Sequence, residues 1–272
     1  MPVILITDNG SVRANATMQL RKLADDLSHK TGLVIHPVSL KHADKISAEK
    51  LEGKPAQIFQ KFMREKLSDG ELEFIMLPVF FGKSKALTSF VPEEVTLLKQ
   101  EYGDFKFDIA AVIYPLPRGE ALLSDIIYDH ILSTTKKKRL PMDNLVLVDH
   151  GSPSPRVTEV RRHLAQTVQQ KLPENCFLEQ AVMERRDDKK YDFNGDLLKD
   201  WLLKKVNEGQ TTAVVILMFF LPGRHAGEGG DIVEICHSVM EEYPDFTISI
   251  SPLITEHPKF LSILQKRLSE LL

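Results

Sequence analysis

The sequence predicts an α/β protein of two similar doubly wound domains, each a parallel sheet flanked by helices. Short apolar runs alternate with amphipathic stretches along the chain, as they do in βαβ units. An internal repeat is also present, because residues 3–11 read like residues 144–152 at an offset of 141 positions. Residues 80–84 resemble residues 221–225 at the same offset. Two separated matches at one offset indicate a duplicated unit rather than chance.

Each expected element follows from this alternation. In the second copy we expect strands at 145–149, 176–183, 213–221 and 246–251, and helices at 156–171, 196–208, 230–243 and 259–272. The first copy repeats the strands near 2–7, 33–39, 72–80 and 107–114. The run 213–221 is continuously apolar, which is typical of a parallel strand covered on both faces. We expect domains at 1–132 and 144–272, with the basic cluster 136–139 in a solvated linker near 133–143.

Composition excludes several classes of partner. The chain has 272 residues and a formal net charge of -3, which gives no reason to expect nucleic acid or an anionic membrane surface. The N-terminus lacks the features of a signal peptide, and the longest apolar run, Ala213 to Leu221, is too short to span a bilayer. Cys176 and Cys236 have neither metal-type spacing nor a disulfide pattern. These features predict a cytoplasmic protein.

Three side chains are expected at the carboxyl ends of strands in the second copy. His150 ends the first strand, Glu184 follows the second, and His225 lies four residues beyond Leu221. Ligands of open parallel sheets collect at this edge. Neutral imidazoles suit iron, cobalt, nickel and zinc, while a carboxylate completes the metal shell or accepts protons. The alternative is that each histidine is a hydrogen-bonded structural residue, which is the commoner role of a single histidine near a strand end.

The turn after His150 has two interpretations. Gly151 and Ser152 begin a strand-to-helix turn whose N–H groups and hydroxyl could receive an anion, or Ser152 or Ser154 could simply cap the next helix. A hydrolase triad of Asp149, His150 and Ser152 is disfavoured, because neighbours on one strand point in different directions.

Glycines and arginines flank the other two candidates. The loop 223–230 is rich in glycine and could bind phosphate, but it matches neither the dinucleotide fingerprint nor the P-loop, so no nucleotide is expected. Arg156 could pair with a carboxylate of an acidic ligand. Arg185 and Arg186 are followed by Asp187 and Asp188, which favours a self-neutralised surface loop.

Four segments of the second half, in this order, resemble the sirohydrochlorin chelatase family: 149–152, 183–186, 219–225 and 230–232. These are the small class II chelatases of cobalamin and siroheme synthesis, akin to protoporphyrin ferrochelatase. The segments 251–253 and 257–258 also fit the family, whereas the first half resembles the same unit more faintly.

The resemblance implies a two-lobed chelatase that works without ATP, a lyase that inserts a divalent metal ion into sirohydrochlorin or a related tetrapyrrole. The ion (Co²⁺, Fe²⁺ or Ni²⁺) is a substrate, and no tightly bound cofactor is expected. By similarity, His150 and His225 would hold the ion, with Glu184 completing the metal site and removing pyrrole protons. Residues expected to orient the macrocycle's carboxylates are Gly151, Ser152, Arg156, Gly223 and Arg224.

The first half departs from this pattern. Asn9 stands opposite His150, Ser84 opposite His225, and Lys41 and His42 lie near the position of Glu184. The resemblance therefore implies a degenerate first domain that forms a wall of the cleft, one active site per chain, and a monomer or weak homodimer. The alternatives are a tetrapyrrole or metal carrier without turnover, and a purely structural duplication in which the three candidate residues lie apart.

Overall fold

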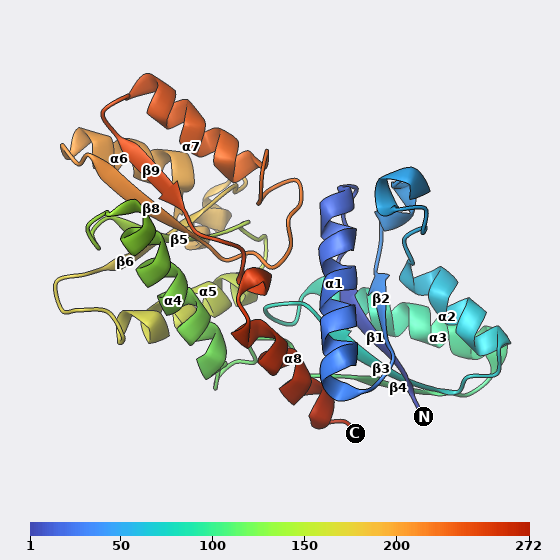
Figure 1. The fold of residues 1–272 in the computed structure, drawn as a ribbon. Coiled ribbons are helices and arrows are strands. Elements are labelled where there is room, and N and C mark those ends of the chain that lie inside the picture. Colours follow the sequence, from blue (N-terminus) through green and yellow to red (C-terminus); the bar gives the residue numbers. More distant parts are fainter. The chain divides into compact units, whose positions relative to one another are not determined.

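The chain contains two units, each built on its own parallel sheet (Figure 1). The structure is a computed structural model that describes residues 1–272. By internal contacts, one unit comprises Met1–Pro115 and Leu261–Leu272, and the other comprises Leu116–Phe260. The chain thus passes from the first unit to the second and returns for its last residues.

The first unit has a four-stranded sheet in the order β2-β1-β3-β4, with all pairs parallel. Its elements are β1 (Val3–Asp8), α1 (Ala14–Thr31), β2 (Ile35–Ser39), α2 (Phe59–Ser68), β3 (Glu73–Pro78), α3 (Val91–Tyr102) and β4 (Lys106–Ile109). Short helical turns occur at Ala43–Lys45, Ala48–Leu51 and Ala86–Phe90. Side chains from α2 and α3 share one apolar core with alternate residues of the strands. The other face of the sheet is therefore left for α1, which contacts β1 and β2.

The second unit has a five-stranded sheet in the order β7-β6-β5-β8-β9, again parallel throughout. Its elements are α4 (Ala121–Lys138), β5 (Leu145–Asp149), α5 (Pro155–Gln169), β6 (Leu178–Val182), β7 (Asp196–Leu197), α6 (Leu198–Asn207), β8 (Thr212–Leu217), α7 (Asp231–Glu242) and β9 (Thr247–Ile250). The final helix is α8 (Lys259–Ser269), and 3-10 turns lie at Lys189–Asn194 and Ile254–Glu256. Helices α6 and α7 pack on one face, while α4 and α5 contact the strands and each other.

Burial on both faces explains why the central strands read as continuous apolar runs. All five residues of β5 are buried, and Val146 and Val148 belong to the core shared with α6 and α7. Strand β8 ends at Leu217, earlier than the sequence predicts, although Met218 still donates a hydrogen bond to the carbonyl of Val148. The predicted α/β class with parallel sheets is confirmed.

The predicted linker near residues 133–143 is wrong for its first half, because α4 continues through Lys138. Thr134 and Thr135 are buried, and the three lysines 136–138 occupy the last turn of the helix. Cations at this position interact favourably with the negative end of the helix dipole. A basic run therefore ends a helix here rather than forming a linker.

The strand registers refine the match between the two halves. Asp8 pairs with Ser39 and Asp149 with Val182, so the offset at the second strand of each sheet is 143 rather than 141. Thr7 pairs with Pro78 and Val148 with Leu217, which gives 139 at the third strand. In this register Lys41 stands at the position of Glu184, whereas His225 lies in a loop, 218–230, that is longer than its counterpart, 79–85.

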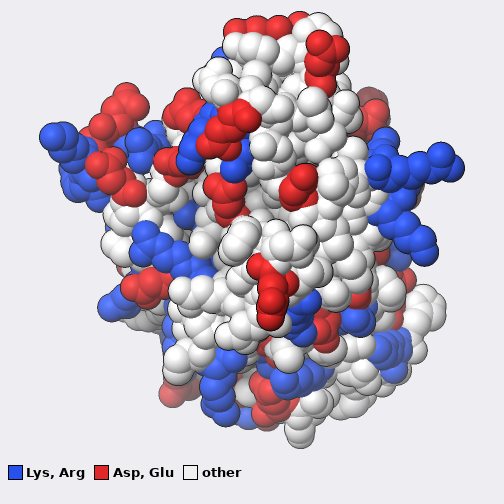
Figure 2. All heavy atoms as spheres, turned by 90° about the vertical axis from the view of Figure 1, so that its left-hand side faces the viewer, with Lys and Arg blue, Asp and Glu red and all other residues white.

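The surface charges and the cysteines do not indicate a particular binding partner. Lys and Arg side chains lie among Asp and Glu on the face shown in Figure 2, without a broad area of one sign. No helix combines the length and apolar character needed to cross a membrane. Cys176 and Cys236 are both buried free thiols, and burial raises the pKa of the Cys236 thiol to about 12.

Candidate functional site

The three predicted site residues meet at the carboxyl edge of the second sheet. His150, Glu184 and His225 follow β5, β6 and β8, which are neighbours in the sheet. The Nε2 atom of His150 lies 3.2 Å from Oε1 of Glu184, and the imidazole rings of His150 and His225 are 4.4 Å apart between centroids at an angle of 70°. Parallel topology thus joins residues that are up to 75 positions apart in sequence. The purely structural reading, in which they lie apart, is wrong.

Gly151 makes the approach of the first two strand ends possible. Its φ is +89°, and a Cβ atom at this position would lie 2.0 Å from the carbonyl oxygen of Glu184. Any side chain would therefore push Glu184 away from His150. The first unit has the same turn, because Gly10 has φ +91° and its Cβ would lie 1.7 Å from the carbonyl oxygen of Lys41. Lys41 is thus the geometric counterpart of Glu184.

Asp231 orients His225, a role that the sequence analysis missed. Its Oδ2 atom lies 2.6 Å from Nδ1 of His225, and the N–H of Ile232 donates to the carbonyl of His225. The carboxylate fixes the tautomer with hydrogen on Nδ1 and leaves the Nε2 lone pair available. An acidic residue in the first turn of a helix is commonplace, so the sequence offered no separate signal for this contact.

His150 makes a polar contact through each ring nitrogen. Nδ1 contacts the carbonyl oxygen of Gly151 at 3.0 Å, a bond in which only the imidazole can donate. Nε2 then faces Glu184, whose Oε1 lies 3.2 Å away. No three His, Cys, Asp or Glu side chains are arranged as a preformed metal cage. Binding an ion at His150 therefore involves separating this pair.

A buried polar network holds the turn that carries His150. Asp149 accepts hydrogen bonds from the Gly151 N–H at 3.1 Å and from Nη1 of Arg161 at 2.6 Å. Arg161, only 2% exposed, also donates to the backbone carbonyl of Asn194. The Asn194 side chain in turn binds both the N–H and the carbonyl of Ser152. These hydrogen bonds thus fix the backbone on either side of His150.

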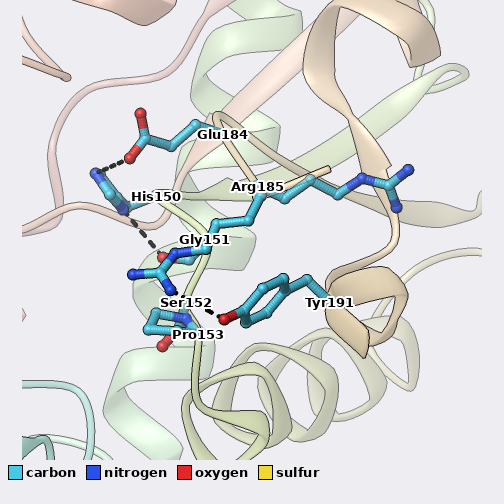
Figure 3. A pocket seen from close by; sticks show the side chains of 8 residues that line it. His150, Gly151, Ser152, Pro153, Glu184, Arg185 and Tyr191 are labelled. Atoms are coloured by element: carbon cyan, nitrogen blue, oxygen red, sulfur yellow. Dashed lines mark hydrogen bonds and ion pairs between the residues drawn. The ribbon is translucent and has the colours of Figure 1, made fainter. Parts of the chain in front are cut away.

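A pocket of about 310 Å³ opens at this site (Figure 3). Its walls are formed by His150, Gly151, Ser152, Pro153, Glu184, Arg185, Arg186 and Tyr191. Figure 3 shows the side chain of Arg185 extending away from His150. Its guanidinium donates to the carbonyl of Gly195 and lies 3.5 Å from Asp192.

Of the remaining predicted residues, some line this pocket and others do not. Gly151 and Ser152 line it, whereas Arg156 is exposed in the first turn of α5 and is not among its lining residues. Gly223 and Arg224 lie on the β8–α7 loop, also outside the lining, and Arg224 is 74% exposed with its Nε 3.8 Å from Asp231.

The prediction that Arg185 and Arg186 are neutralised by Asp187 and Asp188 is wrong. Asp188 pairs with Lys190, and Arg185 pairs with Asp192. Arg186 instead donates a hydrogen bond to the hydroxyl of Tyr191. A 3-10 turn at Lys189–Asn194 brings these later residues back beside the arginines, which a count of adjacent charges does not reveal.

Comparisons with known proteins agree with this fold. A family model described as CbiX matches residues 144–271. Among solved structures, SirB from Bacillus subtilis with Fe3+ is 14% identical with a TM-score of 0.70, covering 99% of this chain and 95% of that one. The sirohydrochlorin chelatase SirB from Bacillus subtilis subspecies spizizenii in complex with cobalt has the same identity and coverage, with a TM-score of 0.67. CbiX, described as the terminal enzyme for biosynthesis of siroheme in denitrifying bacteria, is 14% identical over 99% of both chains, with a TM-score of 0.60. No curated protein matches by sequence.

The two parallel sheets, superimposable on chelatase structures over nearly the whole chain, define a protein of the class II chelatase fold. His150, Glu184 and His225 all lie within the segment that the family model matches. The segment that the CbiX model matches, 144–271, includes most of the second unit and all of α8.

Proposed function

We propose that this protein inserts a divalent metal ion, cobalt or iron, into sirohydrochlorin or a related tetrapyrrole. The observation that carries the proposal is the convergence of His150, Glu184 and His225 at one strand edge within the CbiX-family segment. The presence of Fe3+ and cobalt in SirB structures of the same fold supports a metal substrate. The described role of CbiX in siroheme biosynthesis supports the tetrapyrrole.

The two imidazoles would receive the incoming ion. The Nε2 atom of His225 is left open by the bond from Nδ1 to Asp231, and it is the first candidate ligand. Nε2 of His150 becomes a ligand once it separates from Glu184. Imidazole suits cobalt, iron, nickel and zinc alike, so the cellular supply of each ion contributes to the choice of metal.

Glu184 would handle the protons. Insertion replaces two pyrrole N–H bonds by metal–nitrogen bonds, so two protons must leave for each ion that enters. The Glu184 side chain is 63% exposed, which lets it accept a proton from the macrocycle side and release it to water before accepting the second. None of these steps consumes a nucleotide.

The first unit would carry no metal site. Asn9 and Lys41 replace an imidazole and a carboxylate at the corresponding strand ends, and a lysine ammonium repels a divalent cation. The Lys41 ammonium lies 3.7 Å from the ring centroid of Phe90, a cation–π contact. This arrangement supports one active site per chain, in the second unit.

The test is anaerobic absorbance spectroscopy of sirohydrochlorin mixed with the protein and Co²⁺, Fe²⁺ or Ni²⁺. A rapid spectral shift above the rate without protein establishes insertion. A bound chromophore with an unchanged rate for every ion would instead support the carrier, the alternative function. The carrier is the weaker proposal because it has no use for the proton-accepting Glu184.

Asp231→Ala is expected to weaken binding of the metal ion without changing binding of the macrocycle. Loss of the carboxylate frees the His225 ring to rotate and to carry its hydrogen on Nε2, and outer-shell partners of metal ligands typically contribute about 10- to 100-fold. The KM for Co²⁺ should rise by that order while the KM for the macrocycle stays constant. Glu234→Ala is the control, because Glu234 is exposed and also lies in the first turn of α7. Equal effects of the two substitutions would contradict the role of Asp231.

A further inference from the structure

Arg186 makes no ion pair with the carboxylates of its loop. In the segment 185–192, Arg185 lies 3.5 Å from Asp192 and Lys190 lies 2.8 Å from Asp188. Arg186 contacts the Tyr191 hydroxyl rather than a carboxylate. Its positive charge is therefore not neutralised by an ion pair.

The contact with Tyr191 orders this cation and leaves donors available. Nη1 of Arg186 donates to the Tyr191 hydroxyl at 2.9 Å, and the centre of the guanidinium lies 5.3 Å from the ring. A guanidinium has five N–H bonds in a planar fork. Because the hydroxyl oxygen accepts from Arg186, its own hydrogen can be donated to another group. Together the two side chains present a positive charge with several donors.

These donors line the same pocket as two of the candidate metal ligands, His150 and Glu184. His150, Glu184 and Ser152 share its walls with Arg186 and Tyr191. The Ser152 hydroxyl oxygen accepts a bond from the N–H of Ser154, which again leaves a hydroxyl hydrogen free. Guanidinium groups bind carboxylates through two parallel hydrogen bonds. Glu184 is the one carboxylate in the lining, and it is paired with His150 at 3.2 Å.

We propose that Arg186 and Tyr191 form a subsite for one carboxylate of the macrocycle. This inference rests on the proposed function and identifies where an acidic side chain of the tetrapyrrole is held beside the metal ligands. Bound there, the carboxylate neutralises Arg186 and fixes one edge of the macrocycle relative to His150. The subsite contributes to binding and orientation, not to proton transfer.

The test compares Arg186→Leu and Tyr191→Phe with Lys189→Leu. Lys189 is exposed, carries the same charge and lies outside the pocket lining, so it controls for net charge. Arg186→Leu should raise the KM for sirohydrochlorin by about 10-fold or more, and Tyr191→Phe by a few-fold, with the KM for Co²⁺ unchanged. Arg186→Lys, which keeps the charge but not the fork, should fall between the wild type and Arg186→Leu.

A second measurement identifies the group that is bound. Binding of metal-free sirohydrochlorin and of its methyl ester is followed by quenching of the macrocycle's fluorescence, with no turnover required. Wild type should prefer the free acid, and the preference should shrink by about 10-fold in Arg186→Leu. If Arg186→Leu keeps the wild-type preference, or behaves like Lys189→Leu, the subsite is overturned while the chelatase proposal stands. If the wild type neither binds nor converts the macrocycle, the chelatase proposal itself fails.

Discussion

Alanine at His150 or His225 is expected to abolish metal insertion and to leave the second unit folded. Both side chains are partly exposed, 43% and 31% respectively, and neither lies inside a helix or strand. Their removal creates no cavity in the core. Each substitution removes a candidate metal ligand. The loss of kcat/KM should therefore exceed the roughly 10- to 100-fold loss that is typical when a hydrogen-bond partner of a metal ligand is removed. The measurement is the initial rate of Co²⁺ insertion, together with a thermal melt to verify folding.

His237→Ala is the matched control for these variants. His237 is an exposed histidine of α7 in the same unit, remote in sequence from the strand ends. It should retain wild-type rates. The double variant His150→Ala with His225→Ala should be scarcely slower than either single variant, because residues that act as a unit show non-additive losses. Wild-type insertion by either single variant would remove that histidine from the proposed metal site.

The candidate site could be predicted because parallel topology turns sequence order into spatial order. Continuous apolar runs at 145–149 and 213–221 indicated buried parallel strands, and polar residues directly after such strands must gather at one edge. This reasoning placed His150, Glu184 and His225 together although up to 75 positions separate them. It needed no knowledge of the side-chain conformations.

The supporting contacts could not be predicted, since each depends on a turn whose shape the sequence pattern does not specify. Asp231 reaches His225 only because the loop 223–230 folds back onto the start of α7. Tyr191 meets Arg186 through a 3-10 turn that carries no periodic signal. The offset of 141 likewise held for the first strands and the start of the helices that follow them, but it shifted to 143 and 139 at the second and third strands. A fixed offset therefore misplaces residues from the second strand onward.

The buried pair of Arg161 and Asp149 provides the largest expected effect on stability. Arg161 is 2% exposed and Asp149 7% exposed, and breaking a buried pair by removing one partner typically costs about 3–5 kcal/mol. Arg161→Leu should therefore lower the free energy of unfolding by that amount. Urea titration followed by the fluorescence of Trp201, the single tryptophan, which is buried in the same unit, measures it directly.

The pH dependence of this loss has a definite sign. Burial raises the pKa of Asp149, and the Arg161 guanidinium opposes that rise. Without Arg161 the folded-state pKa lies further above the unfolded value, so the folded chain holds the proton more tightly than the unfolded chain. The loss of stability caused by the charge of Asp149 is therefore complete at pH values above its folded-state pKa. It becomes smaller as the pH falls from that pKa to the pKa of Asp149 in the unfolded chain. The first unit already contains a buried aspartate at the position of Asp149 with no arginine at the position of Arg161. Leu20 occupies that helix position, and burial raises the pKa of Asp8.

Combining Arg161→Leu with Asp149→Asn separates charge from packing. The amide carries no charge, and its oxygen can still accept the hydrogen bond from the Gly151 N–H. Stability at neutral pH should recover in part, and the added dependence on pH should disappear. If the double variant is as unstable as Arg161→Leu, the loss instead comes from the bonds of Arg161 to the Asn194 and Ala181 carbonyls. Those bonds hold the segment that binds Ser152, so the stability of the second unit and the position of His150 then depend on the guanidinium itself rather than on its charge pair.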